Sequence, residues 1–345
     1  MKLVALVYII ALLMLTSCSV SNPVRYQAGF IGTFDTYIQV VIYASSQQEF
    51  GEHFAYVRDI FKHYHALFDI YNNYEDINNL KTVNDNAGIA PVAVDPAVIE
   101  LILLSRQMYY DTGGALDITL GSVLSIWHDY RMLGIANPEQ ATIPPYPSLR
   151  AARAIGSIDD LIVDEQSGTI FLAHQGMLLD VGATAKGFAA ERAAQRLQAR
   201  GVISALIEAG GDVVTVGRSM TDGGRPWNIG VRHPLTGGII DAVQLQGLSA
   251  LTSGGYHRAY TVNGLEYNHI IDPVTLMPAE RFASITIIHE SAMVGEMLST
   301  ALFVLPLADG LTLAQRFGAA AIWVMHDGTV EFNEMYREFS SNLSD

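Results

Sequence analysis

Residues 179–187 read Leu-Asp-Val-Gly-Ala-Thr-Ala-Lys-Gly and combine a carboxylate, several small residues and a lysine. An apolar strand would deliver Asp180 into a turn that opens a helix, and Lys186 adds a mobile positive charge. Small residues let a ligand approach the backbone, and the N-terminus of a helix favours an anion. Strand–glycine–helix turns are common in α/β proteins, so a purely structural turn explains the segment equally well. The segment matches neither the Walker A nor the Gly-x-Gly-x-x-Gly pattern.

Two other glycine-containing segments carry polar side chains that could bind a ligand. Residues 208–212 read Glu-Ala-Gly-Gly-Asp, so that Asp212 would lie at a tight turn after an apolar strand. Residues 252–256 read Thr-Ser-Gly-Gly-Tyr and offer hydroxyl groups to a phosphate from a position between strands. Ordinary β-turns account for both segments about as well as ligand binding does.

Two pairs of residues complete the set of candidate chemical groups: a histidine with a carboxylate, and a carboxylate with a hydroxyl. His269 and Asp272 lie three residues apart at a predicted strand end, so His269 could act as a general base that Asp272 orients. The chain has ten histidines, and a single one is more often structural. Glu296 and Thr300 lie four residues apart on a predicted helix and therefore share one face. A carboxylate and a hydroxyl oxygen suit a hard cation such as Mg²⁺, although each pair alone is better explained by packing.

The elements that would position these residues alternate irregularly between strands and helices, which predicts an α+β (mixed α/β) fold. Residues 132–150 contain four prolines and are expected to form an irregular surface connector. Helices are expected at 48–68, 77–83, 95–112, 185–200, 294–304 and 309–317. Strands are expected at 28–43 (two strands or one bent strand), 161–163, 169–173, 177–180, 204–208, 213–216, 227–231, 242–245, 259–262 and 320–325.

The composition limits the classes of ligand. Half of the residues are hydrophobic and 16% are charged, which indicates a globular chain. The formal net charge of −15 argues against binding to nucleic acid, because the phosphates would be repelled. An acidic protein that handles a polyphosphate ligand would need a cation to shield it.

The N-terminus predicts export and a lipid anchor. Lys2 precedes an apolar run at 3–15, which is typical of a signal peptide and too short to span a bilayer. The following Leu-Thr-Ser-Cys resembles a bacterial lipobox, and Cys18 is the only cysteine. An ordinary signal peptide with a chance cysteine is the alternative. We therefore expect a signal peptide at 1–17, an acylated (palmitate-bearing) Cys18, a tether at 18–27 and one domain at 28–345. The protein would be held at the periplasmic or extracytoplasmic face of a membrane.

Taken together, these segments resemble the FAD:protein FMN transferase family, also called ApbE. The resemblance covers nearly the whole chain after the signal peptide, and its blocks occur in the order found in the family. The blocks are Gly32-Thr33, Gly114-Ala115-Leu116-Asp117-Ile118-Thr119 with Trp127, Asp180 to Gly187, Ala209 to Asp212, Pro226-Trp227 with His233-Pro234, Thr252 to Gly254, His269 to Thr275, and Leu298 to Ala301.

This resemblance implies a function and a set of site residues. Family members hold FAD in a cleft between two interlocked subdomains, transfer FMN to a Thr or Ser hydroxyl of a target protein through a phosphoester bond, release AMP and require Mg²⁺. Subunits of membrane redox complexes would be acceptors. Carried over by motif, FAD would contact Ile31, Tyr74, Ala115, Leu116, Asp117, Asp180, Lys186 and Ile270. The metal would be bound by the Ala183 carbonyl, Glu296 and Thr300, while His269 would be the base.

Two rival functions and three departures from the family pattern stay open. The same site could hydrolyse FAD to FMN and AMP, or the protein could be a non-catalytic flavin-binding lipoprotein. Glu296 stands where the family usually has Asp, which could alter the metal geometry or metal preference. Leu276 replaces a glycine, which could reshape the turn beside His269, and Gly255 replaces a common Asp.

Overall fold

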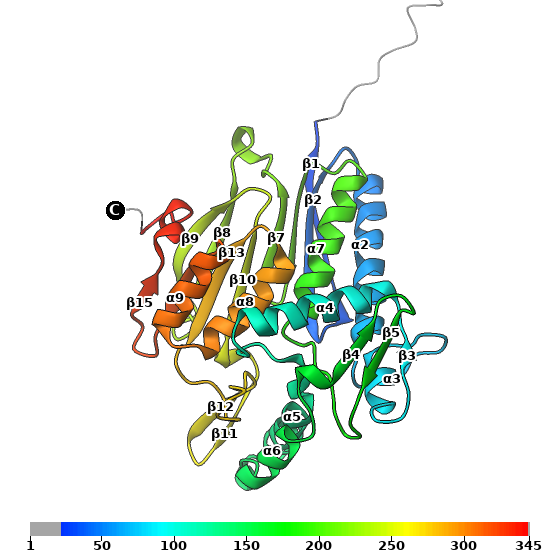
Figure 1. The fold of residues 1–345 in the computed structure, drawn as a ribbon. Helices are drawn as coiled ribbons and strands as arrows, with labels where there is room; N and C mark the ends of the chain where they lie inside the picture. The colour runs from blue at the N-terminus through cyan, green and yellow to red at the C-terminus, as the bar shows by residue number, and fades with distance from the viewer. Residues whose placement is uncertain (1–21, 344–345) are drawn as a thin grey trace, which may run out of the picture.

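The computed structural model describes residues 22–343, so Cys18 and the predicted signal peptide lie outside the described residues. Its largest element is an antiparallel sheet of eight strands (Figure 1). The strands, in spatial order, are β1 (Val24–Thr33), β2 (Thr36–Ala44), β6 (Ser204–Ala209), β7 (Asp212–Gly217), β10 (Ser249–Gly254), β13 (Ser284–His289), β14 (Ala320–Val324) and β15 (Val330–Phe332). Between residues 22 and 343, none of the helices combines the length and the apolar character that a membrane span requires.

Helices cover one face of this sheet, as Figure 1 shows. They are α2 (Gln47–Phe68), α7 (Ala185–Ala199), α8 (Ala292–Val304) and α9 (Leu307–Arg316). Strand β2 shows why the sheet has two buried faces, because successive side chains point to opposite sides. Ile38 and Val40 are fully buried against the helices, whereas Val41 packs on the opposite face.

A hairpin and the C-terminal segment cover the opposite face. The hairpin consists of β8 (Trp227–Arg232) and β9 (Ile239–Leu245), and the C-terminal segment contains the 3₁₀ helix η6 (Glu334–Glu338). The buried Tyr336 hydroxyl donates to Asp241 Oδ2 at 3.0 Å, and Asp241 Oδ1 accepts from the backbone N–H groups of Ala242 and Asn342. These bonds satisfy a fully buried carboxylate and attach the C-terminal segment to the hairpin.

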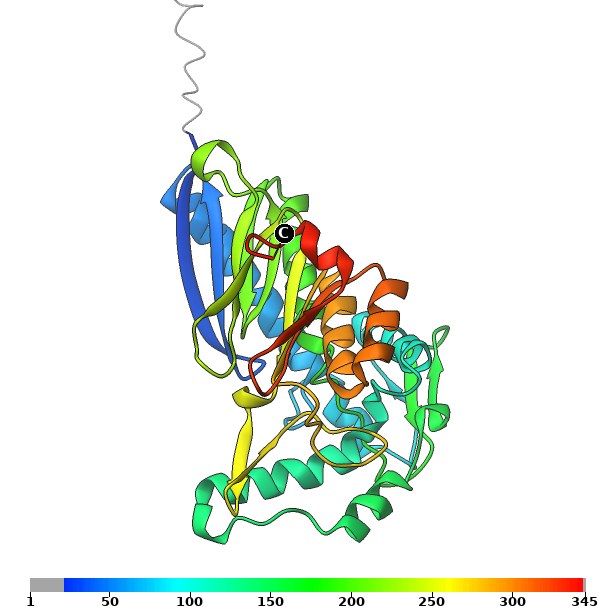
Figure 2. The same ribbon diagram turned by 90° about the vertical axis from the view of Figure 1, so that its left-hand side faces the viewer.

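The remaining elements gather at one end of the sheet (Figures 1 and 2). Some of these remaining elements contribute side chains to the same core as α7 and α8, and the others pack into a separate hydrophobic cluster, so the two parts of the chain interlock. These elements are α3 (Leu80–Asp85), α4 (Pro96–Asp111), α5 (Gly121–Ala136), α6 (Tyr146–Arg153), the three-stranded sheet β3 (Val92–Ala93), β5 (Thr169–Leu172) and β4 (Leu161–Asp164), and the hairpin β11 (Ala259–Val262) and β12 (Leu265–Asn268).

The structure confirms the mixed α/β class and most predicted elements, and residues 28–43 form two strands rather than one. Three predictions are wrong. Residues 177–180 form no strand, and Thr252 and Ser253 lie within β10 rather than between strands. The predicted connector at 132–150 is irregular only in part, because α5 continues to Ala136 and α6 starts at Tyr146. Pro147 lies in the first turn of α6, where the missing N–H costs nothing, so this proline marks a helix start.

Candidate functional site

The segment that carries Asp180 is positioned by side-chain hydrogen bonds rather than by strand pairing. The buried Asn84 side chain donates to the Leu179 carbonyl at 3.0 Å and accepts from the Leu179 N–H at 2.8 Å. On the other side, the Asp180 N–H donates to the Ile118 carbonyl at 2.9 Å. The Asn84 amide therefore replaces a neighbouring strand and fixes the backbone directly before Asp180. Asn84 was not identified from the sequence, where its only signal is its place in a segment rich in asparagine.

Lys186 joins two buried carboxylates from different elements. Its ammonium donates to Asp212, the first residue of β7, and to Glu296 Oε1 in α8 at 2.7 Å. Asp212 and Glu296 are 2% and 5% exposed, so each needs a charged or hydrogen-bonding partner. Asp212 Oδ1 also accepts from the Thr252 N–H at 2.8 Å. The network brings together Lys186, Glu296 and the second glycine turn, where the sequence had left Asp212 without an assigned role.

The Gly-Gly pair before Asp212 is required by the backbone. Gly210 and Gly211 have φ angles of +60° and +98°, and Gly210 leaves no room for a Cβ, which would lie 2.4 Å from Thr36 Oγ1. Such angles permit the tight turn between the paired residues Ala209 and Asp212. The turn thereby delivers the Asp212 carboxylate to Lys186.

Helices α7 and α8 approach each other closely at Gly187. A Cβ at this position would lie 2.5 Å from the Ala292 carbonyl oxygen. The Gly187 N–H belongs to the first turn of α7, where backbone donors have no carbonyl partner within the helix, and it donates to Glu296 Oε2 at 2.7 Å. Glu296 thus caps the N-terminus of α7.

Hydroxyl groups line the same side of α8. The Ser253 hydroxyl lies 2.8 Å from the Ser299 hydroxyl and 3.5 Å from that of Thr300, which follows Glu296 by one helical turn. Carboxylate, hydroxyl and carbonyl oxygens form a ligand set that fits Mg²⁺, which usually binds one or two carboxylates together with substrate phosphates. Across residues 22–343, no group of three or more His, Cys, Asp or Glu side chains is arranged to hold a metal ion. A metal here would therefore also need hydroxyl, carbonyl or phosphate oxygens as ligands.

The segment around His269 is organised by Asp272 and an unusual leucine. His269 is half-buried, and Asp272 Oδ1 accepts from the backbone N–H groups of Val274 and Thr275 at 2.8 and 3.2 Å. Leu276 has a φ of +60°, the left-handed region that favours glycine, and its carbonyl accepts from Trp127 Nε1 at 2.9 Å. The turn therefore keeps the conformation that a glycine would adopt. The base role of His269 and the orienting role of Asp272 stay predictions.

The predicted flavin residues come from several elements with different exposure. Ile31 in β1 is 77% exposed, whereas Ile270 is buried. The Tyr74 hydroxyl donates to Asp69 Oδ2 at 2.9 Å, and burial together with this carboxylate raises the pKa of Tyr74 to about 12. Tyr74 is therefore a neutral hydrogen-bonding group at physiological pH.

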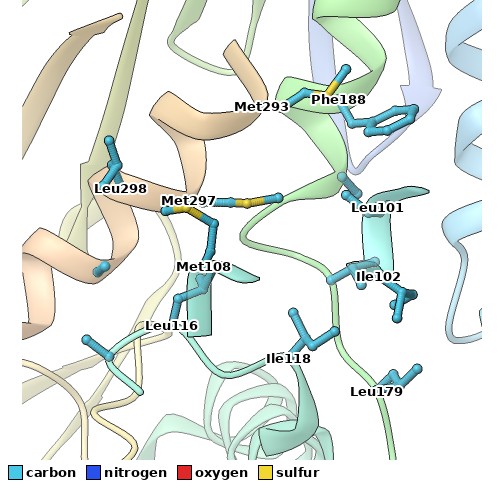
Figure 3. Close-up of a cluster of buried hydrophobic side chains, with 14 of the residues drawn as sticks. Leu101, Ile102, Met108, Leu116, Ile118, Leu179, Phe188, Met293, Met297 and Leu298 are labelled. Carbon is cyan, nitrogen blue, oxygen red and sulfur yellow. The ribbon is translucent and has the colours of Figure 1, made fainter. Parts of the chain in front are cut away.

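Residues 115–119 lie at the end of a buried hydrophobic cluster that also supports α4, α7 and α8. Figure 3 shows Leu116 and Ile118 in this cluster, together with Leu179 from the segment before Asp180 and Met297 from α8. Asp117 caps a 3₁₀ helix through the Thr119 N–H at 2.8 Å and lies 3.2 Å from an Arg153 guanidinium nitrogen. The cluster thus holds three of the family motifs in one rigid unit.

The charge of Asp180 is controlled by burial and by nearby cations. Burial raises the pKa of Asp180, and the Gly182 N–H, which donates to Oδ1 at 2.8 Å, opposes that rise together with Arg131 and Arg258. Asp180 therefore belongs to a second charged region, on the side of α5. Neither arginine was identified from the sequence, because their positions in α5 and before β11 carry no motif.

Comparisons with known proteins agree on one family. A family model described as the ApbE family matches residues 34–323. The FAD:protein FMN transferase of Treponema pallidum is 33% identical over 274 residues, 74% of this chain and 73% of that protein. A Klebsiella pneumoniae protein of the same name is 30% identical over 269 residues, 75% of this chain and 80% of its own.

Solved structures agree with this family match. The ApbE protein of Thermotoga maritima superposes with a TM-score of 0.81 at 28% identity and covers 92% of this chain and 100% of its own. The apo form of the flavinyl transferase ApbE of Pseudomonas stutzeri gives 0.76 at 27% identity, with 92% and 97% covered.

We expect Gly187→Ala to destabilise the protein, because the new methyl group would push α7 away from α8. Overpacking of this kind costs about 1–3 kcal/mol. Gly51→Ala is the matched control, since Gly51 lies in α2 and, apart from the nearby backbone of its own helix, nothing comes within 4 Å of the place its new methyl group would take. That substitution should stabilise the protein by about 0.5–1 kcal/mol. Urea unfolding measures both free energies, and equal effects would show that Gly187 is not a close contact.

Proposed function

The chain belongs to the ApbE family and is a flavin transferase, and we propose that it moves FMN from FAD to a Thr or Ser hydroxyl of a protein with the help of Mg²⁺. The observation that carries this proposal is the junction of Lys186 with Asp212 and Glu296 at the N-terminus of α7. One cation between two carboxylates leaves an excess of negative charge. Thr300, one helical turn after Glu296, and Ala183, directly before the N-cap of α7, would supply further oxygen ligands.

The reaction is a displacement at the phosphorus of the FMN half of FAD. A hydroxyl oxygen of the acceptor forms a bond to this phosphorus, the bond to the bridging oxygen breaks, and that oxygen leaves with AMP. Phosphoryl transfer of this kind depends on positioning and on neutralising charge. Mg²⁺ held by Glu296, Thr300 and the Ala183 carbonyl would shield the phosphates and stabilise the departing AMP.

The protein's own groups supply positioning and proton transfer. Lys186 can donate to a phosphate oxygen from the N-terminus of α7, where the helix dipole favours an anion. His269 would take the hydroxyl proton as the new bond forms. Because Asp272 holds the turn that follows His269, it would keep this histidine in place. Ile31, Tyr74, Ala115, Leu116, Asp117 and Ile270 would contact FAD.

We further propose that the enzyme works outside the cytoplasm, attached to a membrane through acylated Cys18. The apolar run before this cysteine and the lack of any other cysteine support the proposal. The acceptors would then be exported domains, such as those of membrane redox complexes. Incorporation of labelled palmitate that a Cys18→Ser variant loses would support this anchor, and equal labelling of both would refute it.

Mass spectrometry distinguishes transfer from its rivals. The protein is incubated with FAD, Mg²⁺ and a domain that carries an accessible acceptor threonine, with a Thr→Val acceptor as the control. We expect the mass of FMN on the intact acceptor only, together with one AMP for each FMN. Free FMN and AMP without acceptor modification would identify a pyrophosphatase, and bound but intact FAD would identify a non-catalytic flavin protein.

Replacing Thr300 tests the metal site. Thr300→Val keeps the shape of the side chain and removes one oxygen ligand, so Mg²⁺-dependent turnover should fall by at least about ten- to hundredfold. Glu296→Gln should have a similar effect. Thr312→Val, on the exposed side of α9, is the control and should leave the Mg²⁺ titration unchanged. A normal Mg²⁺ titration for Thr300→Val would place the metal elsewhere.

Replacing His269 separates catalysis from binding. A general base contributes about 10²- to 10⁴-fold, so His269→Ala should lower kcat by that amount while FAD binding changes little. The comparison requires kcat with saturating acceptor and the Kd for FAD measured without Mg²⁺. If kcat falls and the Kd for FAD rises by the same factor, His269 is a binding residue and another group removes the proton.

A further inference from the structure

A group of basic side chains lies beside Asp180, apart from the junction at Lys186. This basic cluster consists of His128 and Arg131 from α5 and Arg258 from the segment before β11. An Arg131 guanidinium nitrogen lies 3.1 Å from His128 Nδ1. Figure 2 shows α5 extending past the end of the large sheet, where the β1–β2 turn also lies. Arg258 reaches that turn, since its guanidinium lies 3.3 Å from Asp35 Oδ2.

Arg131 is half-buried and lacks a counterion in the part of the chain that the structure describes. No carboxylate between residues 22 and 343 lies within 4 Å of its guanidinium. Burial lowers the pKa of Arg131, and the like charge of Arg258 lowers it further. A partly desolvated cation that faces a second cation is unfavourable unless an anion joins them.

The surrounding acidic groups do not balance this charge. Asp180 uses Oδ1 to accept from the Gly182 N–H, and burial raises its pKa, which disfavours its charged form. Asp35 is paired with Arg258, but its side chain is 92% exposed, so solvent screens it. The hydroxyl of Tyr71 adds no charge, because burial raises its pKa. The region therefore stays positive in a protein that is acidic as a whole.

The chemistry of the cluster favours a phosphate. A guanidinium offers several N–H donors in a planar fork that matches the oxygens of a phosphate. The ring of Tyr71 lies 5.4 Å from that of His128, which contacts Arg131, so a pair of aromatic rings borders this arginine. A charged fork next to aromatic rings suits a nucleotide, whose phosphate and planar ring system are linked through a sugar.

We propose that the basic cluster binds a phosphate group of the nucleotide substrate, with Arg131 as the main donor and Arg258 as the second. This inference rests on the proposed function, because it assumes that FAD enters the site beside Asp180. The phosphate belongs either to the adenylate half or to the FMN half. An acidic side chain of the acceptor protein is the competing ligand, and the experiment excludes or identifies it.

Binding is measured by calorimetry on the full chain with EDTA present, so that no turnover occurs, and the probes are FAD, AMP, FMN and riboflavin. We expect Arg131→Gln to weaken FAD binding by about ten- to hundredfold. Binding of AMP, of FMN or of both should weaken as well. The nucleotide whose binding weakens shows whether the bound phosphate belongs to the adenylate half or to the FMN half of FAD. Riboflavin has no phosphate, so its binding should not change. Arg131→Lys should recover part of the loss.

Matched controls separate this role from a general loss of charge or structure. Lys62→Gln removes one positive charge from the exposed side of α2 and should leave all four Kd values unchanged. If Arg131→Gln does not fold, the same four Kd values are measured for Arg258→Gln, whose position is exposed, and the same changes are expected. The proposal is overturned if the variant binds riboflavin more weakly by the same factor as FAD. It is also overturned if FAD binding is unchanged while KM for the acceptor rises. The transfer assay on the unaltered protein tests the proposed function separately.

Discussion

The ammonium group of Lys186, shared by two buried carboxylates, is the interaction on which the site depends. Asp212 starts a central strand and Glu296 lies in α8, so the lysine in the first turn of α7 sets how the sheet and both helices meet. Removing one partner would leave a buried charge uncompensated, which typically costs about 3–5 kcal/mol. The close approach at Gly187 allows this geometry. Stability and chemistry therefore rely on the same few atoms, and the site cannot be rearranged without loosening the fold.

Most of the fold follows from local sequence patterns, and the failures have physical causes. Helix α2 has the helical periodicity of its buried residues, and α4 has Asp95 as N-cap before Pro96, so both were predicted closely. Strand β13 (Ser284–His289) was missed because it is buried on both faces and shows no alternation. The strand predicted at 177–180 is absent because the Asn84 side chain, instead of a neighbouring strand, forms the hydrogen bonds to the Leu179 backbone. These two residues are 95 positions apart in the sequence.

The sequence predicted those site residues that belong to recognisable motifs. It did not predict residues that matter only because the fold brings them close to the site. Lys186 and Glu296 were identified from motifs, and the structure brings them within hydrogen-bonding distance. The replacement of a glycine by Leu276 left open whether the turn beside His269 is reshaped, and the backbone there has the left-handed conformation while the side chain is buried. Arg131 belongs to no recognisable pattern. Its importance comes from half-burial without a counterion among the described residues, which only the three-dimensional arrangement of α5 and its neighbours reveals.

The long hairpin of β1 and β2 sets the distance between the start of β1 and the basic cluster. Strand β1 begins at Val24 and ends at Thr33 beside Asp35, and ten residues of extended strand span about 30 Å. With Cys18 acylated as proposed, the hairpin acts as a rigid spacer whose far end lies next to the basic cluster. The site would then lie as much as about 30 Å from the anchored end of the protein, a reach that suits acceptor hydroxyl groups on domains that project from the membrane.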